Sequence, residues 1–178
     1  MEAILDLLKE GHPRPTAQQV SDRSGISIRS IFRLFDDMES LHRLAVDRQL
    51  ALVRPLFVDL PVEGSVGERV AALVENRAEV YEVIAPVRRS GINLASRSPA
   101  IRRGLTEADR FCRRQVADVF APELSLSGAA PELLDALDAA TSWETWERLR
   151  SPQGLSPARA GRTMALTVTA LLTASEPS

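Results

Sequence analysis

The stretch from Thr16 to Phe35, TAQQVSDRSGISIRSIFRLF, limits the fold more than any other part of the chain. It predicts two short helices joined by a tight turn. Thr16 has a side chain suited to the N-cap of the first helix, and Ser27 is suited to the N-cap of the second. Gly25 stands between them, where a helix ends on a residue that tolerates positive φ. Paired short helices of this kind are typical of proteins that bind DNA.

The second helix of this stretch, residues 27–35, divides into two faces if its side chains advance by about 100° per residue. The face expected to be buried holds Ile28, Ile31, Phe32 and Phe35. The opposite face holds Arg29, Ser30 and Arg33. Such a face is cationic and rich in hydrogen-bond donors, as a DNA contact requires. The two arginines taken alone more often mark an ordinary solvated surface helix.

The whole constellation favours the DNA interpretation, because it resembles the N-terminal helix-turn-helix of the TetR family of bacterial transcription regulators. The resemblance is carried, without a gap, by Thr16, Val20, Ser24-Gly25-Ile26-Ser27, Ile31-Phe32, Phe35, Glu39 and Leu41. It implies an all-α protein in two parts. Residues 1–46 would form a three-helix DNA-binding domain, and residues 47–178 a helical ligand-binding and dimerisation domain.

The predicted DNA contacts follow from the chemistry of the second helix. Arg29 and Ser30 are expected to read base edges, where an arginine can grip guanine through two acceptors. Arg33, one turn further, would reach a base or a phosphate. Thr16 and Ser27 would meet phosphate oxygens at helix N-termini.

Three positions depart from the family pattern. Phe32 replaces a tyrosine that commonly touches phosphate, and Met38 replaces a lysine that commonly does the same. Ile28 stands where a polar residue is frequent, although an apolar group there can meet a thymine methyl. We therefore expect weaker non-specific binding and a shallower salt dependence than the family norm.

Helical spacing continues through the rest of the chain, and no strand pattern or repeat emerges. The turn-rich residues 59–65 mark the best boundary. The helices expected after it cover residues 66–86, 87–95, 99–120, 131–150 and 157–174. The last two resemble the helices through which TetR-like proteins form homodimers, with Met164, Val168, Leu171 and Leu172 on one face. Whether that face packs within one subunit or between two is open at this level.

A small-molecule effector would lie between helices of the second part, in an apolar pocket with a few polar anchors. The candidate lining residues are Tyr81, Arg88, Asn93, Phe111, Cys112, Trp143, Trp146 and Met164. Core packing is the alternative for each of them. Residues 86–114 hold eight arginines and two acidic residues. Arginine stems lying on apolar surface, an acidic ligand or a subunit contact would each explain this excess.

Composition narrows the function classes further. The net charge is −2, and residues 1–50 hold seven basic and eight acidic residues, so a DNA footprint must come from local patterning. Cys112 is the single cysteine, which excludes an internal disulfide. We see no secretory leader and no apolar run long enough to span a membrane, and therefore expect a cytoplasmic protein.

Enzyme chemistry finds little support in the sequence. His12 and His42 are the only histidines, and neither lies at metal-ligand spacing from a cysteine or carboxylate. There is no phosphate loop and no nucleophile motif. We expect no enzyme, no metal and no cofactor. The sequence favours a homodimeric, ligand-released regulator of a pseudo-palindromic operator, a repressor above all. The alternative is the same scaffold without operator binding, acting through protein contacts or ligand sequestration.

Overall fold

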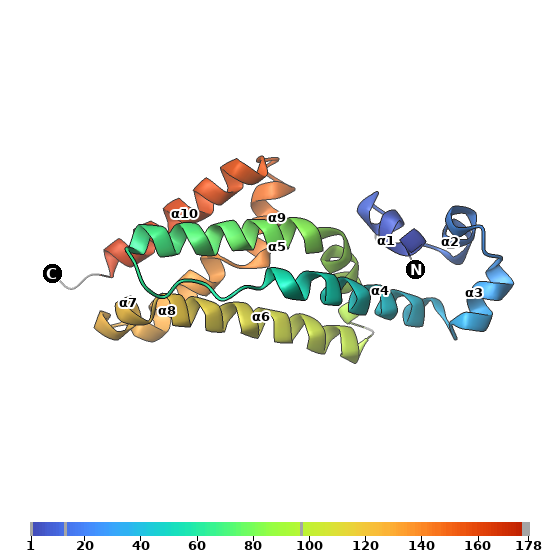
Figure 1. Ribbon diagram of the computed structural model, residues 1–178, viewed down its shortest axis with the longest axis horizontal. Coiled ribbons are helices and arrows are strands. Elements are labelled where there is room, and N and C mark those ends of the chain that lie inside the picture. The colour runs from blue at the N-terminus through green and yellow to red at the C-terminus, as the bar shows by residue number, and fades with distance from the viewer. Residues whose placement is uncertain (1, 13, 97, 176–178) are drawn as a thin grey trace. The chain divides into compact units, whose positions relative to one another are not determined.

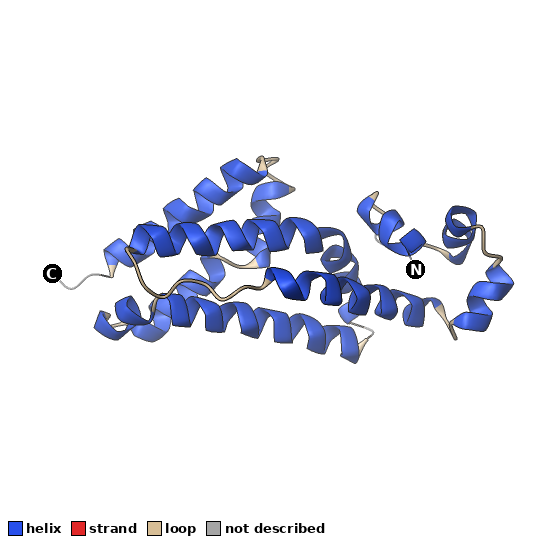
Figure 2. Ribbon diagram, in the orientation of Figure 1, coloured by secondary structure: helices blue, strands red, loops and turns tan. Residues whose placement is uncertain are grey.

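The computed structural model describes residues 2–12, 14–96 and 98–175, and within these ranges the protein contains helices and loops but no strand (Figures 1 and 2). This confirms the all-α class. The helices are α1 (Glu2–Lys9), α2 (Ala17–Ser24), α3 (Ile28–Leu34), α4 (Met38–Val53), the 3-10 turn η1 (Arg54–Leu56), α5 (Val66–Ala95), α6 (Pro99–Val119), α7 (Ala121–Leu126), α8 (Ala130–Ala140), α9 (Trp143–Arg150) and α10 (Pro157–Ala174).

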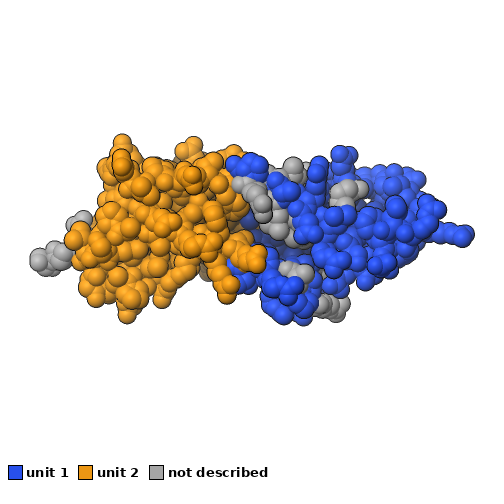
Figure 3. Space-filling model, turned by 60° about the horizontal axis from the view of Figure 1, so that its bottom comes forward, with its two compact units in different colours: residues 1–55, 83–106 blue, residues 56–82, 107–178 orange. Residues whose placement is uncertain are grey.

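The chain forms two compact units, and neither is continuous in sequence (Figure 3). The first unit comprises Met1–Pro55 and Val83–Thr106, and the second comprises Leu56–Glu82 and Glu107–Ser178. This division differs from the single boundary after residue 46 that the sequence suggests. The physical reason lies in α5, because Val87 belongs to the same apolar cluster as side chains of α1 and α4.

The core of the first unit is built on α1, whose Ile4, Leu7 and Leu8 are buried as their spacing predicts. The cluster around them is completed by Leu5, Val20, Ile31, Leu41, Ala45 and Val87. Since α1 packs against both α2 and α4, its burial fixes the position of the short α2 and α3 helices. A single exposed helix of eight residues would be marginal in water without this packing.

The core of the second unit is formed where α10 packs against α8 and α9. Met164, Val168 and Leu172 lie on the buried face of α10 and are at most 4% exposed. The stripe that the sequence assigns to helix packing therefore packs within its own subunit. Trp146 and Leu137, from α9 and α8, are also fully buried in this unit.

Two helix boundaries differ from the sequence prediction. Helix α5 runs through Pro86, although a proline was expected to end it. The proline removes one backbone donor, but Ala85 and Val87 beside it are buried, and this packing holds the helix together. The expected helix over residues 131–150 is instead split into α8 and α9. Ser142 begins the second piece by accepting a hydrogen bond from the Thr145 N–H at 3.2 Å.

Other predicted ends are confirmed to within one residue. Helix α6 ends at Val119, one residue before the expected end of the helix over residues 99–120, and α10 covers Pro157–Ala174 as expected.

Candidate functional site

The first helix of the α2–α3 segment is capped as its sequence predicts. Thr16 has extended backbone angles, and its hydroxyl accepts a hydrogen bond from the Gln19 N–H at 3.2 Å. In turn, Gln19 Oε1 accepts a hydrogen bond from the Thr16 N–H at 2.9 Å. This reciprocal pair is a capping box, which satisfies two backbone donors that the helix itself leaves open.

The turn between α2 and α3 depends on Gly25. Its φ of +70° lies in the left-handed region, and its N–H donates to the Ser21 carbonyl at 2.9 Å. Two residues later Ser27 caps α3 by accepting from the Ser30 N–H at 3.2 Å. The turn therefore fixes where α3 begins, and so which of its side chains point away from the first unit.

Helix α3 contacts its own unit along a narrow line. Ile31 is 3% exposed, and Phe35 just beyond the helix is half-buried against the same cluster. Phe32 was expected on this buried face, and that prediction is wrong, because 47% of it is exposed. The core covers only the turn around Ile31, so Phe32 lies at the edge of the contact. Ile28 is half-buried.

Arg29 and Arg33 are both exposed on α3, one turn apart. Neither forms an ion pair or hydrogen bond with any residue that the structure describes. Arg23, on α2, differs from them because its guanidinium holds Glu10 through two bonds of 2.7 and 2.5 Å. The hydrogen bond from Arg23 lowers the pKa of the Glu10 carboxyl. Two arginines of this segment are thus available to a partner, and the third is engaged.

The eight predicted ligand-binding residues are divided between the two units. Arg88 and Asn93 belong to the first unit, and the other six belong to the second. Arg88 is buried, whereas Asn93 is exposed and donates its amide to the Arg89 carbonyl at 2.9 Å. That these eight residues form one ligand site stays a prediction.

Tyr81, Trp143, Trp146 and Met164 form part of the second unit's core, each at most 3% exposed. The Tyr81 hydroxyl donates to the Thr141 carbonyl at 2.9 Å, and its ring meets Trp143 edge-on with centroids 5.7 Å apart. The Trp146 indole donates to Glu82 Oε1 at 3.0 Å. These polar groups are satisfied internally, which is the pattern of core packing and not of a ligand pocket.

The arginine-rich stretch of residues 86–114 serves several local purposes. Arg113 pairs with Asp135 at 2.5 Å and Asp138 at 3.2 Å, which ties α6 to α8. Arg114 lies over the Phe111 ring, 5.9 Å from its centroid. Arg97 lies outside the described residues. Arg113 thus has a structural role, whereas Arg114 has no carboxylate partner in the described chain.

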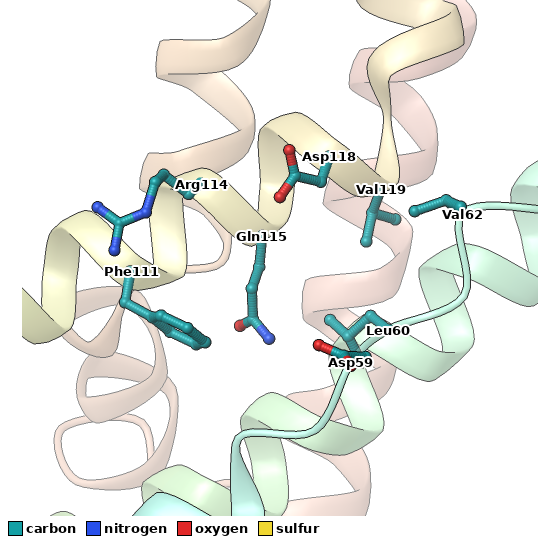
Figure 4. Close-up of a pocket in the computed structure, with 8 residues that line it drawn as sticks. All are labelled: Asp59, Leu60, Val62, Phe111, Arg114, Gln115, Asp118 and Val119. Carbon is teal, nitrogen blue, oxygen red and sulfur yellow. The ribbon is translucent and has the colours of Figure 1, made fainter.

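A groove in the second unit collects residues that the sequence did not single out (Figure 4). One face of α6, including Phe111, Gln115 and Val119, forms one wall, and residues 59–62 form the other. Phe111 alone of the predicted ligand residues lines it. Gln115 and the buried Arg77 behind it were missed. In the sequence, the one indication of this pair is the position of Arg77 between Leu73 and Tyr81, at the spacing of the apolar face of α5.

Neither a metal cluster nor a membrane helix is found in the described part of the chain. No three His, Cys, Asp or Glu side chains there are grouped to hold a metal ion. No described helix combines the length and the apolar character needed to cross a bilayer.

Comparison with known proteins returns no match for this chain among family models, curated proteins or solved structures. The case for function therefore rests on the residues themselves.

Proposed function

We propose that the protein is a ligand-responsive, DNA-binding transcription regulator that acts as a homodimer on a pseudo-palindromic operator, in the first instance as a repressor. One observation carries the proposal. Arg29 and Arg33 project from α3 without a partner in the described chain, while Ile31 anchors the opposite side of the same helix. An anchored short helix with a free cationic face is what entry into a major groove requires.

Arg29 is our candidate for base reading. A guanidinium that donates to both major-groove acceptors of guanine discriminates by about 1 to 3 kcal/mol. Arg33 follows four residues later, about 6 Å along the helix axis. That distance is close to two base-pair steps of about 3.4 Å each. The two arginines can therefore address neighbouring positions on one half-site.

Phe32 lies beside them and is better exposed than Ile28. We therefore propose that Phe32, in place of Ile28, makes the apolar contact with a thymine methyl.

Phosphate binding should be modest, because the hydroxyls of Thr16 and Ser27 are already engaged. Thr16 Oγ1 donates to Gln19 Oε1 at 3.1 Å, and Ser27 Oγ donates to Ser30 Oγ at 3.0 Å. Each would have to give up a local bond to meet a phosphate through its hydroxyl. With nearly balanced charge in residues 1–50, we expect few released counterions and a shallow salt dependence.

Dimerisation is proposed through the last helices, as the resemblance implies, but through a different face from the one first suggested. Met164, Val168 and Leu172 are buried within the protomer. The outward face of α10 carries Leu166, which is 72% exposed, and the small exposed residue Ala170. A second copy would pack on this face.

A protein-contact module without operator binding is the second candidate. It is favoured by the apolar side chains exposed along the same segment, Ile26 at 42%, Phe32 at 47% and Leu34 at 63%. Exposed apolar groups beside arginine are also typical of protein interfaces.

A gel-shift experiment separates the two candidates. The full chain is mixed with DNA from upstream of its own gene, and with unrelated DNA, at about 50 and about 200 mM salt. The regulator proposal predicts a shift of the upstream DNA at both salt concentrations. Absence of any shift at the lower salt concentration would favour the protein-contact module.

A further inference from the structure

The groove between α6 and residues 59–62 has the size and lining of a small-molecule site. It encloses about 400 Å³, within the range of ligand pockets. Its walls include the apolar side chains of Leu60, Val62, Phe111 and Val119. Phe111 is held in place by the edge of Phe57, with ring centroids 5.2 Å apart. Figure 4 shows Gln115 extending from α6 toward Asp59 and Leu60.

A buried cation lies directly behind Gln115. Arg77 is 0% exposed, and its guanidinium donates to Gln115 Oε1 at 2.7 Å and to the Cys112 carbonyl at 3.1 Å. Its Nε has no hydrogen-bond partner, which is also true of Arg69, but unlike Arg69 it has no carboxylate partner in the described chain. A buried guanidinium surrounded by neutral acceptors is costly, because a charge removed from water is normally paired.

The same helix shows how a buried arginine is normally stabilised. Arg69, two turns before Arg77, forms two bonds to the Glu123 carboxylate, at 2.5 and 2.9 Å. Arg77 has an amide oxygen in the corresponding role. Hydrogen bonds to an ionised acceptor are roughly twice as strong as those to a neutral one. A carboxylate would therefore outcompete the Gln115 amide for Arg77.

Gln115 is placed so that a ligand can displace it. It lines the groove while being only 9% exposed, and its amide nitrogen donates to the Val58 carbonyl at 3.1 Å. The side chain thus contacts both the groove and the buried charge. Rotation of this one side chain would open Arg77 to the groove.

We propose that this groove binds a small monocarboxylate with an apolar body, whose carboxylate replaces Gln115 Oε1 on Arg77 while the body lies along Phe111 and Leu60. Arg114, over the Phe111 ring at the groove's edge, adds a second positive charge. Asp59 and Asp118 also line the groove and are exposed, so solvent and salt weaken, without removing, their repulsion of a single carboxylate. They disfavour ligands with two negative charges. That such a ligand is the effector depends on the proposed function, whereas its binding does not.

The test uses the full chain and straight-chain carboxylates from butanoate to decanoate, each beside its neutral primary amide. Isothermal titration calorimetry should show at least one carboxylate binding about tenfold more tightly than its amide, which corresponds to about 1.4 kcal/mol. Equal binding of acid and amide, or no carboxylate binding at millimolar concentration, would overturn the proposal.

The decisive variant is Gln115→Glu, which supplies Arg77 with an internal carboxylate. It should fold, melt at a higher temperature than the wild type, and lose carboxylate binding about tenfold or more. Gln153→Glu makes the same chemical change at an exposed turn position and should bind as the wild type does. Wild-type binding by Gln115→Glu would overturn the proposal. A gel shift without ligand tests the proposed function separately, so the two failures are distinguishable.

Discussion

Arg69 of α5 and Glu123 of α7 form a two-bond ion pair in the second unit, with side chains only 5% and 19% exposed. Arg69 also donates to the Val119 carbonyl at 2.5 Å and lies 5.8 Å from the centroid of the Phe120 ring. One guanidinium thus joins α5 to the junction of α6 and α7. Val119, at this junction, also lines the groove.

Removing the charge of Glu123 should destabilise the protein strongly. Glu123→Gln leaves Arg69 buried without a counter-ion, and we expect the free energy of unfolding in urea to fall by about 3 kcal/mol. Asp135→Asn is the matched control, because it breaks an exposed pair with Arg113 and should cost about 1 kcal/mol or less. A similar loss in both variants would show that Arg69 is not held by Glu123.

Stability should also depend on pH through this pair. The hydrogen bonds from Arg69 lower the pKa of Glu123 in the folded protein. The contribution is therefore complete above the ordinary glutamate pKa of about 4.3 and is lost as pH falls through the lowered folded value. Urea midpoints measured from neutral to acidic pH should fall less steeply in Glu123→Gln than in the wild type. Parallel curves would contradict the assignment.

The turn before α3 should depend on the backbone freedom of Gly25. Its φ of +70° is strained for any residue with a Cβ, although no neighbouring atom lies within 4 Å of that position. Gly25→Ala should lower the free energy of unfolding by about 1 kcal/mol. Gly128→Ala, also free of steric contacts and not at positive φ, should be neutral or slightly stabilising. An equal effect of both changes would mean that the turn geometry does not require glycine.

The proposed dimer contact on α10 can be tested by charge. Leu166→Arg should shift the protein to monomers in sedimentation experiments, because a buried unpaired charge opposes association. Leu126→Arg changes a leucine that is equally exposed, at 70% against 72%, but lies on α7. We expect it to remain dimeric. If Leu126→Arg dissociates the dimer and Leu166→Arg does not, the dimer interface does not lie on α10.

Local chemistry in the sequence predicted much of the helical framework. Caps and breakers act within a few residues, so Thr16, Gly25 and Ser27 were assigned correctly without tertiary information. Asp37 also caps the start of α4, where it accepts from the Ser40 N–H at 2.7 Å and has its pKa lowered by that bond. Pro86 was misjudged, because packing on both sides outweighs one missing hydrogen bond.

The candidate sites were less accessible to sequence reasoning. Phe32 and Ile31 look equally apolar, and only the position of the neighbouring helices decides that Ile31 alone is buried. Tyr81, Trp143 and Trp146, chosen as ligand contacts, are instead buried in the core of the second unit, where large aromatic side chains bury much apolar area. Arg77 and Gln115 were missed because they are distant in sequence and meet only when α5 and α6 pack together.

Arg29 is proposed to read a base, and selection of binding sites from a random duplex pool measures that role. The wild type, Arg29→Ala and Arg48→Ala are compared, since Arg48 is also exposed but lies on α4. If Arg29 reads a base, we expect the wild type and Arg48→Ala to select the same pseudo-palindromic site. Arg29→Ala should lose base preference at one position of each half-site. Each half-site should lose about 1 to 3 kcal/mol of discrimination at that position. An unchanged site preference in Arg29→Ala would show that Arg29 does not read a base.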